Sequence, residues 1–501
     1  MKLRVCEVLI GLLDVRRRLP LVGCVVALGC ASELERASQA GLARTSARLN
    51  AAEGGARPGR PAARFDGAQF DGARFDGARF DGKLSSYVAH AFALSPSLRS
   101  SFEQWRAAAS KPAQERKLSE PAISYAAFVR HVETRVGPQQ HRLGIRWMFP
   151  WPSKLTAGGR AAAYGALAQQ RRFEAHALTL AAQVAHAYWK LWRARRSKQV
   201  RKRQHAVLLA LADQVRARIA AGTASLADLA QVDLSISRSD DSVAGLAETI
   251  RAASAALIRR VGAPPASETP TELQPPWGVG NLPADDIEAL RSFAWAHPRV
   301  GALSLLSKSS DQRVLRARAS RYPTIGVGVD WMITGQALNR ELDDSGKDAV
   351  MAMVSLSLPL WTSAYSAAEA QARAEGAAFA AQAQALRDQA TAELETVMSR
   401  LRDAARRARL YRSTLIPQAE TTYRSVLDGY ANSRSTLAAI LLAERELLEL
   451  QIGLIGAQAD WAAGWASLEH VVGRPVAPQQ GGEQAVSDRQ AVSDQQRTGG
   501  W

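Results

Sequence analysis

The sequence has little cysteine, few aromatic residues and none of the common catalytic motifs. Its three cysteines all lie within the first thirty residues, so the remaining body holds no disulfide. After residue 30 no run of about 18 apolar residues occurs, which excludes a transmembrane helix there. The eight histidines show no HxxxH or HExxH spacing, and the glycines form no phosphate-binding loop. We therefore expect no enzyme activity, no cofactor and no metal site.

Acidic residues are also fewer than basic ones. The 501 residues include 64 Lys and Arg against 47 Asp and Glu, which gives a formal net charge of +17. Such an excess favours an anionic partner or surface without saying which one. Alanine is abundant, and segments such as 367–384 are typical of long helices rather than of a compact globule.

The N-terminus predicts export. A basic run, Arg16–Arg18, precedes a short apolar run that ends at Cys30, and this pattern is typical of a signal peptide over residues 1–30. The segment Ala27–Cys30 resembles a bacterial lipoprotein box, in which Cys30 is lipidated. Cys24 is the alternative, and a signal without lipidation or a later start codon stays open. Ala31 favours sorting to the outer membrane.

Two further segments have low complexity. Phe-Asp-Gly recurs four times, from Phe65 to Phe80, and predicts a tether over residues 31–83, with a short β-solenoid as the alternative. The tail 475–501 repeats Gln484–Asp488 at Gln490–Asp494, and we expect it to be disordered.

The body contains one long pattern twice, at an almost constant offset of about 210 residues. The run that starts at Gly222 matches the run from Tyr430 to Leu441, and both copies close on a Val-Gly pair, at Gly262 and Gly473. Pro150 and Pro359 mark the same upstream corner. The spacing predicts a first repeat over 84–263, a linker over 264–284 and a second repeat over 285–474.

Each repeat is expected to contain two strands. In the first repeat they lie at 123–132 and 140–149, and Leu143, Ile145, Trp147 and Phe149 alternate with more polar residues. Strands of about ten residues with this alternation suit a membrane β-barrel, although an ordinary half-buried sheet has the same pattern. Because four strands cannot close a barrel and lipid does not tolerate open edges, membrane insertion would require oligomerisation.

The rest of each repeat is expected to be helical. The first helices are broken near Pro96 and Pro298. Very long helices follow over 154–221 and 362–416, the second interrupted at Pro417 and continued to Tyr430, and return helices follow over 226–260 and 436–471. The fold class is therefore mainly α with a small membrane β part, built from long helical hairpins in a tandem repeat.

The joint spacing of these features resembles the outer-membrane efflux protein family, the TolC-like channels, over about residues 84–474. The resemblance implies a homotrimer with one twelve-stranded β-barrel in outer-membrane lipid, continued by an α-helical tunnel through the periplasm. It also implies a periplasmic adaptor protein and an inner-membrane pump as partners. The expected function is a passive duct of a tripartite efflux or type I secretion system. The pump and the exported substrate, whether drug, metal or protein, stay open.

In this family the hairpin turns form the periplasmic gate, and the resemblance places it at Gly222, Asp228, Ser433, Ala439 and Leu442. Ser433 stands where the family usually has glycine, and Ala439 and Leu442 occupy places where an acidic residue can form a constriction. Only Asp228 keeps the acidic place. We therefore expect an apolar or partly open constriction rather than an aspartate-lined gate.

Both long helices are basic at the same height in the repeat. Arg195 and Arg196 in the first have counterparts Arg406 and Arg407 in the second, which in a trimer would form a basic belt facing an anionic partner or the solute path. A solvated helix face is the alternative. The rival functions are a non-pore structural coiled-coil lipoprotein of the envelope and a basic scaffold for nucleic acid. The alternating strands and the export signal argue against both.

Overall fold

The computed structural model describes residues 33–55, 80–265, 267–276, 278–338, 343–432 and 434–476. Inter-residue contacts divide the chain into two compact units. Unit 1 holds Glu103–Arg171, Gly301–Ala383 and the described part of Met1–Arg44. Unit 2 holds Arg172–Val300 and the described parts of Thr45–Phe102 and Gln384–Trp501. The predicted lipidation site, with Cys24 and Cys30, lies outside the described residues, as do most of the tether and the tail.

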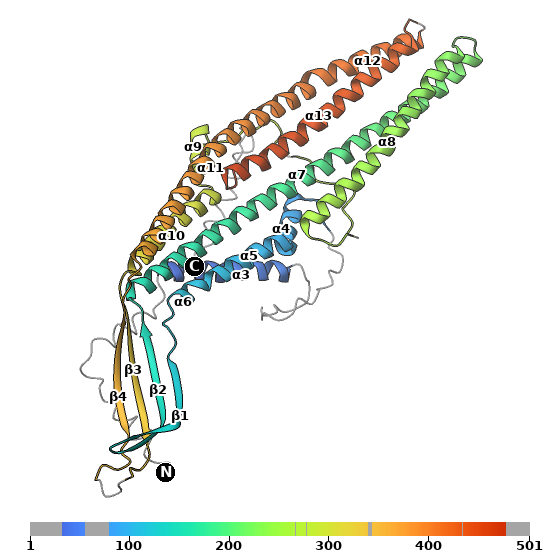
Figure 1. Ribbon diagram of the computed structural model, residues 1–501. Coiled ribbons are helices and arrows are strands. Elements are labelled where there is room, and N and C mark those ends of the chain that lie inside the picture. Colours follow the sequence, from blue (N-terminus) through green and yellow to red (C-terminus); the bar gives the residue numbers. More distant parts are fainter. Residues whose placement is uncertain are drawn as a thin grey trace, which may run out of the picture. The chain divides into compact units, whose positions relative to one another are not determined.

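Unit 1 contains a four-stranded antiparallel sheet in the order β1-β2-β3-β4. Its strands are β1 (Ala122–Thr134), β2 (Gly137–Phe149), β3 (Thr324–Thr334) and β4 (Ala349–Ser357). The pairing of β2 with β3 joins the two repeats, as Figure 1 shows. The sheet therefore forms from both predicted strand pairs.

The register places the alternating side chains of all four strands on common faces. Leu143 pairs with Trp331 and Ile145 with Val329, and Val329 in turn pairs with Ala352. Because side chains one residue apart point to opposite faces, one face is almost wholly apolar. The other face carries Gly144, Asp330 and their neighbours. The alternation predicted for single strands thus gives the whole sheet one apolar and one more polar face.

Helices make up the rest of the first repeat (Figure 1). A proline at position 96 begins the second of the early helices, as expected, because proline suits the first helical turn and not the interior. The elements are α4 (Leu84–Leu94), α5 (Pro96–Ala109), α6 (Lys111–Glu115), α7 (Pro152–Ala220) and α8 (Leu226–Val261).

In the described residues, the second repeat follows a similar plan, with two early helices in place of three and a divided long helix. Its long helix is divided by a π-helical segment, Tyr411–Leu415, directly before Pro417. Proline has no backbone N–H, so the regular hydrogen-bond ladder is interrupted there, and a π turn lets the helix continue. The elements are α9 (Ile287–Trp295), α10 (Pro298–Ala319), α11 (Thr362–Leu410), α12 (Ile416–Ala431) and α13 (Leu437–Val472).

The two Val-Gly pairs are the ends of the return helices. Gly262 and Gly473 cap α8 and α13 with φ of 80° and 77°, a left-handed conformation that favours glycine. A Cβ at Gly262 would lie 2.8 Å from the carbonyl oxygen of Leu94, and a Cβ at Gly473 would lie 2.9 Å from the His297 ring. Each cap thus packs against the break before the proline helix of its own repeat.

The segment predicted as a tether is partly helical. α3 (Glu33–Gly55) lies within it, and its residues Glu35 and Ser38 are buried. The Glu35 carboxylate pairs with Arg116 at 2.5 Å, both in unit 1. The prediction of a tether over 31–83 is therefore wrong for residues 33–55, where helix-forming residues replace the glycine repeats found further along.

Candidate functional site

The first hairpin end is a tight turn between α7 and α8 in unit 2. Gly222 adopts φ of 72°, and the Thr223 backbone N–H donates to the carbonyl of Arg218 at 2.8 Å. No atom lies within 4 Å of the position a Cβ on Gly222 would take, apart from its immediate chain neighbours. Glycine is thus required here by backbone conformation rather than by packing.

Asp228, the one acidic residue of the predicted gate, caps a helix. Its carboxylate accepts from the Ser225 N–H at 2.9 Å and the Ser225 hydroxyl at 2.8 Å, while the Ser225 hydroxyl accepts from the Asp228 N–H. This capping box satisfies free N–H groups of α8. The hydrogen bond from the Ser225 backbone lowers the pKa of Asp228. The carboxylate is therefore held at the start of α8 by Ser225.

The second hairpin end has the same construction. Thr436 caps α13 and accepts from the backbone N–H of Ala439 at 3.3 Å. Asn432 ends α12, and the Arg434 N–H donates to the Gly429 carbonyl at 2.7 Å. Ser433 lies outside the described residues. Two of the predicted gate residues, Asp228 and Ala439, therefore take part in equivalent N-caps.

A direct contact joins the two hairpin ends within unit 2, and the sequence reasoning missed it. The guanidinium of Arg218 donates to the Tyr430 carbonyl at 2.7 Å, and its central carbon lies 4.3 Å from the centre of the Tyr430 ring. A hydrogen bond and a cation–π contact thus act on one residue. The sequence places Arg218 one turn before Gly222, close to the predicted turn. A single sequence does not show that its side chain contacts a residue of the other hairpin.

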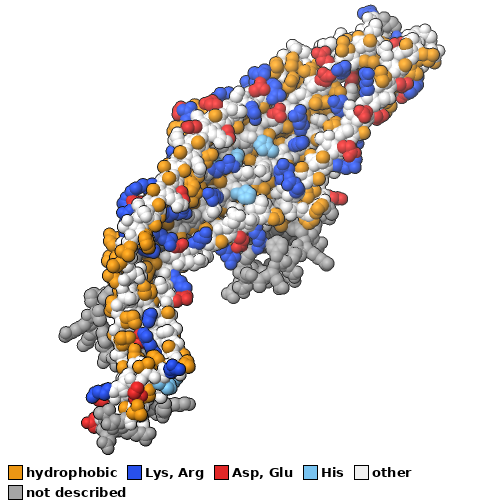
Figure 2. Space-filling model, viewed as in Figure 1, with side chains coloured by type: hydrophobic (Ala, Val, Ile, Leu, Met, Phe, Trp, Pro, Cys, Tyr) orange, Lys and Arg blue, Asp and Glu red, His pale blue; other side chains and the backbone are white. Residues whose placement is uncertain are grey.

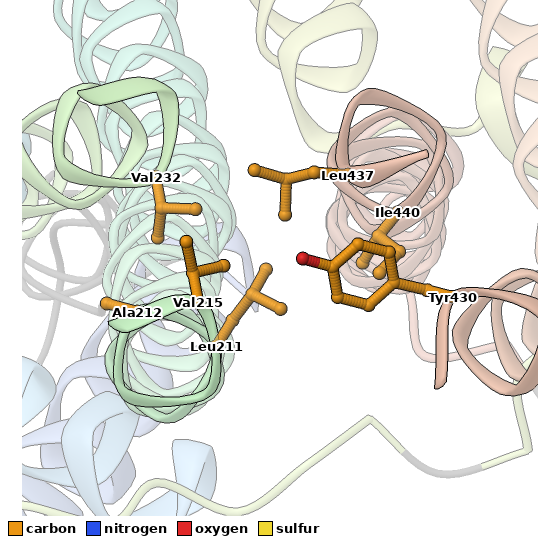
Figure 3. Packing of buried hydrophobic residues seen from close by; sticks show 7 residues of the cluster. All are labelled: Leu211, Ala212, Val215, Val232, Tyr430, Leu437 and Ile440. Atoms are coloured by element: carbon orange, nitrogen blue, oxygen red, sulfur yellow. The ribbon is translucent and has the colours of Figure 1, made fainter. Parts of the chain in front are cut away.

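An apolar cluster supports this contact. Side chains from the first hairpin face side chains from the second, as Figure 3 shows. Val215 and Ile440 are fully buried, and Tyr430 is 9% exposed. The cluster consists of Leu211, Ala212, Val215, Val232, Tyr430, Leu437 and Ile440. Burial of these side chains stabilises the two hairpin ends in one arrangement.

Leu442 lies beside this cluster and points away from it. It is 68% exposed, although Leu441 packs against the cluster. Leu226, at the start of α8, is 75% exposed. Large apolar side chains at solvent-exposed helix positions are candidates for contacts with other chains. Leu442 is therefore available at the position where the sequence predicts an apolar constriction.

The four predicted belt arginines differ in their surroundings. Arg195 is half-buried and donates to the Thr269 side chain and the Pro270 carbonyl, which fixes the linker on α7. Arg406 pairs with Asp403 at 2.7 Å. Arg407 pairs with Asp403 and also with Asp460 on α13, at 2.8 and 3.2 Å. Arg196 is exposed and donates to Gln199 at 2.9 Å. Arg195 and Arg407 thus bond to other segments of the chain, whereas Arg196 and Arg406 have partners on their own helices.

In unit 1 the apolar face of the sheet is uncovered. Ile123 is 75% exposed, Val350 70% and Val354 78%, and on the face in view in Figure 2 apolar side chains cover much of the sheet. A sheet face of this kind is not stable in water and marks a contact with lipid or another protein. No helix in the described ranges is long and apolar enough to cross a membrane.

Aromatic residues lie toward both ends of this apolar face. Trp331 donates to Asp348 at 3.0 Å near the β3–β4 connection. Near the opposite end, the rings of Trp147 and Phe149 lie 4.8 Å apart, and Trp151 stacks on Tyr322 at 5.0 Å. Aromatic rings at such positions suit the two interfaces of a membrane.

Solved outer membrane proteins share this fold. The fold is similar to that of the outer membrane protein VceC from Vibrio cholerae, with a TM-score of 0.63 and 21% identity over 78% of this chain and 96% of that one. It is also similar to the open state of the Neisseria gonorrhoeae outer membrane channel MtrE, with a TM-score of 0.64 and 18% identity over 78% and 89%. The protein thus has the fold of the TolC-like outer membrane channels.

The first part of the sequence is similar to a known family. Residues 88–263, which fall in the first repeat, match the model of the outer membrane efflux protein family. The outer membrane efflux protein BepC from Brucella suis biovar 1 (strain 1330) is 22% identical over 300 residues, which are 60% of this chain and 64% of that protein. The chain therefore spans slightly less than two thirds of the length of this curated relative. The resemblance drawn from the duplicated pattern is confirmed.

Proposed function

We propose that this protein is the outer-membrane channel subunit of a tripartite efflux or type I secretion system. Three copies would join their sheets into one twelve-stranded barrel, and their helical hairpins would form a tunnel in the periplasm. The channel is passive and provides a duct for small molecules or proteins. The family match and the fold support this function.

The observation that carries the proposal is the sheet. It combines an exposed apolar face, aromatic residues toward both ends and two outer edges, those of β1 and β4, without a neighbouring strand in the described chain. An edge strand in lipid leaves its N–H and C=O groups unsatisfied, at a cost of about several kcal/mol for each group. Pairing β1 of one copy with β4 of the next removes every edge. A coiled-coil lipoprotein without a pore would have no use for such a sheet.

The hairpin ends are the proposed gate. The contact between Arg218 and Tyr430 holds the two hairpins of one protomer together, and Leu442 faces outward toward a neighbouring copy or the pore axis. Gly222 and Ser433 supply the turns that rearrange when an adaptor docks. Asp228 and Ala439 shape the N-caps of the return helices. An apolar side chain in place of an acidic one would make this constriction a barrier by dewetting rather than by charge.

The remaining partners follow from the same proposal. A periplasmic adaptor and an inner-membrane pump would supply the driving force, and Cys30 would carry the lipid anchor at the outer membrane. The basic belt rests chiefly on Arg196 and Arg406, because Arg195 and Arg407 bond to other segments of the chain. An anionic adaptor surface is its expected contact.

Two neighbouring positions on β4 test the membrane assignment. Val354 lies on the apolar face and Ser355 on the opposite face. Val354→Lys is expected to reduce the trimer recovered from outer membranes strongly, because a lysine facing the midplane of the lipid costs about 2–4 kcal/mol. Ser355→Lys is the matched control and should assemble as the wild type does. The measurement is the heat-modifiable trimer band of each variant. Equal recovery of both variants would contradict the barrel.

A further inference from the structure

The charged side chains of the sheet are confined to one face where the register is regular. Within that part, Arg142 and Arg146 lie on β2 and Asp330 lies on β3, all on the face opposite the apolar one. The rest of this face is uncharged and consists mainly of Ser, Gly and Met, and β4 carries no charge. In β1, Arg130 and Glu133 balance each other, and both lie where its register with β2 is irregular or beyond it. The regular polar face therefore has an excess of one positive charge.

Glycines on the neighbouring strands leave room for two of these side chains. Asp330 faces Gly144 in the register, and a Cβ on Gly144 would lie only 2.2 Å from the Asp330 Oδ1 atom. Arg146 faces Gly328, and a Cβ there would lie 3.0 Å from its Cγ. Glycine in a strand otherwise weakens it, and is expected where a side chain or backbone must approach closely. The charges thus lie along the wall of the sheet.

The two arginines have different roles. Arg142 donates to the Asp330 Oδ2 atom at 2.5 Å, and Asp330 is only 1% exposed. The Asp330 Oδ1 atom is buried with no hydrogen-bond partner among the described residues. Arg146 is exposed, and within the described ranges no hydrogen bond or ion pair holds it, although its charge also acts on Asp330. The negative charge is buried and compensated by Arg142, whereas Arg146 is exposed.

We propose that this wall favours anionic solutes, with Arg146 as the residue that sets the preference. The proposal rests on the proposed channel, in which the polar face lines the pore because the apolar face contacts lipid. In a closed ring of three sheets every protomer adds one Arg146. Fixed positive charge on a pore wall raises the local concentration of anions and lowers that of cations. The substrate class is thus anionic molecules or molecules with an anionic surface.

Reversal potentials in a KCl gradient across a planar bilayer test the proposal with the purified trimer. The wild type should prefer Cl⁻ over K⁺. Arg146→Gln should reduce this preference and Arg146→Glu should reduce it further, whereas Arg146→Lys, which keeps the charge, should retain it. Asp330→Asn removes the negative charge and should shift the reversal potential the other way. Every variant is measured alone and with Arg218→Ala, so that a closed hairpin end does not hide the contribution of the sheet.

Ionic strength supplies an internal control. The shifts should be largest at about 0.1 M salt, where the Debye length is about 10 Å, and should shrink at about 1 M, where it is about 3 Å. Conducting trimers whose reversal potentials are unchanged by Arg146→Glu would overturn this inference and leave the channel intact. Trimers that never conduct in either background would overturn the proposed function itself.

Discussion

At the scale of single residues, buried polar groups outside the sheet and the hairpin ends show how the second repeat differs from the first. His297 is 6% exposed and lies 6.1 Å from His470, measured between ring centres. Its Nδ1 atom accepts from the Arg299 N–H at 3.1 Å, at the start of α10. A cavity of about 30 Å³ beside the pair is lined by Arg299 and Glu393 as well. The corresponding place in the first repeat holds Ser95.

This histidine predicts a loss of stability in acid. Burial lowers the pKa of His297 to about 4, and repulsion from Arg299 and His470 adds to the effect. Below pH 6.5 the unfolded chain binds a proton that the folded chain rejects until about pH 4, so stability falls as the pH decreases through this window. The loss amounts to on the order of 3 kcal/mol.

The thermal midpoint of the purified protein between pH 7 and pH 4 measures this loss. His297→Asn keeps an acceptor for the Arg299 N–H and removes the titrating group, so the difference between variant and wild type isolates one residue. The midpoint of the variant should fall less. If the midpoints of variant and wild type fell in parallel with pH, the lowered pKa of His297 in the folded protein would be contradicted.

At the scale of elements, the sequence predicted where several helices begin and end. It did not predict which side chains meet at those ends. The Val-Gly pairs and the prolines at 96 and 298 gave helix boundaries, because glycine and proline act through their own backbone. The contact of Arg218 with Tyr430 was missed because it depends on the docking of two hairpins about 210 residues apart in sequence. The role of Asp228 was missed as well, although Ser225 three residues earlier is the signature of a capping box.

Two glycines with the same conformation separate backbone strain from packing. Gly222→Ala is expected to cost about 1 kcal/mol of stability, because φ of 72° disfavours a side chain but no neighbouring atom obstructs it. Gly262→Ala should cost clearly more, because its Cβ would also meet the Leu94 carbonyl at 2.8 Å. Chemical denaturation of both variants measures the difference. Equal losses would mean that the Val-Gly pair merely ends α8 and does not pack against the break before α5.

At the scale of the whole molecule, the sheet of one chain has two unpaired edges and an exposed apolar face in the part that the structure describes. The two-sided strands could be predicted from alternation in the sequence, since period-two patterns fix which residues share a face. The order of the strands required the structure, because β2 pairs with β3 of the other repeat. The outer edges of β1 and β4 and the exposed apolar face are the two observations that support the proposed assembly of several copies in lipid.

Single-channel conductance of the detergent-purified protein in a planar bilayer tests the channel most directly, with the oligomer weighed in the same sample. We expect a trimer with discrete conductance steps. Arg218→Ala should open more often than the wild type, because it removes both the hydrogen bond and the ring contact that join the hairpin ends. Arg251→Ala, an exposed residue of α8 paired with Glu248, is the control and should leave the steps unchanged. A monomer that never enters lipid, or a trimer silent in every variant, would contradict the account.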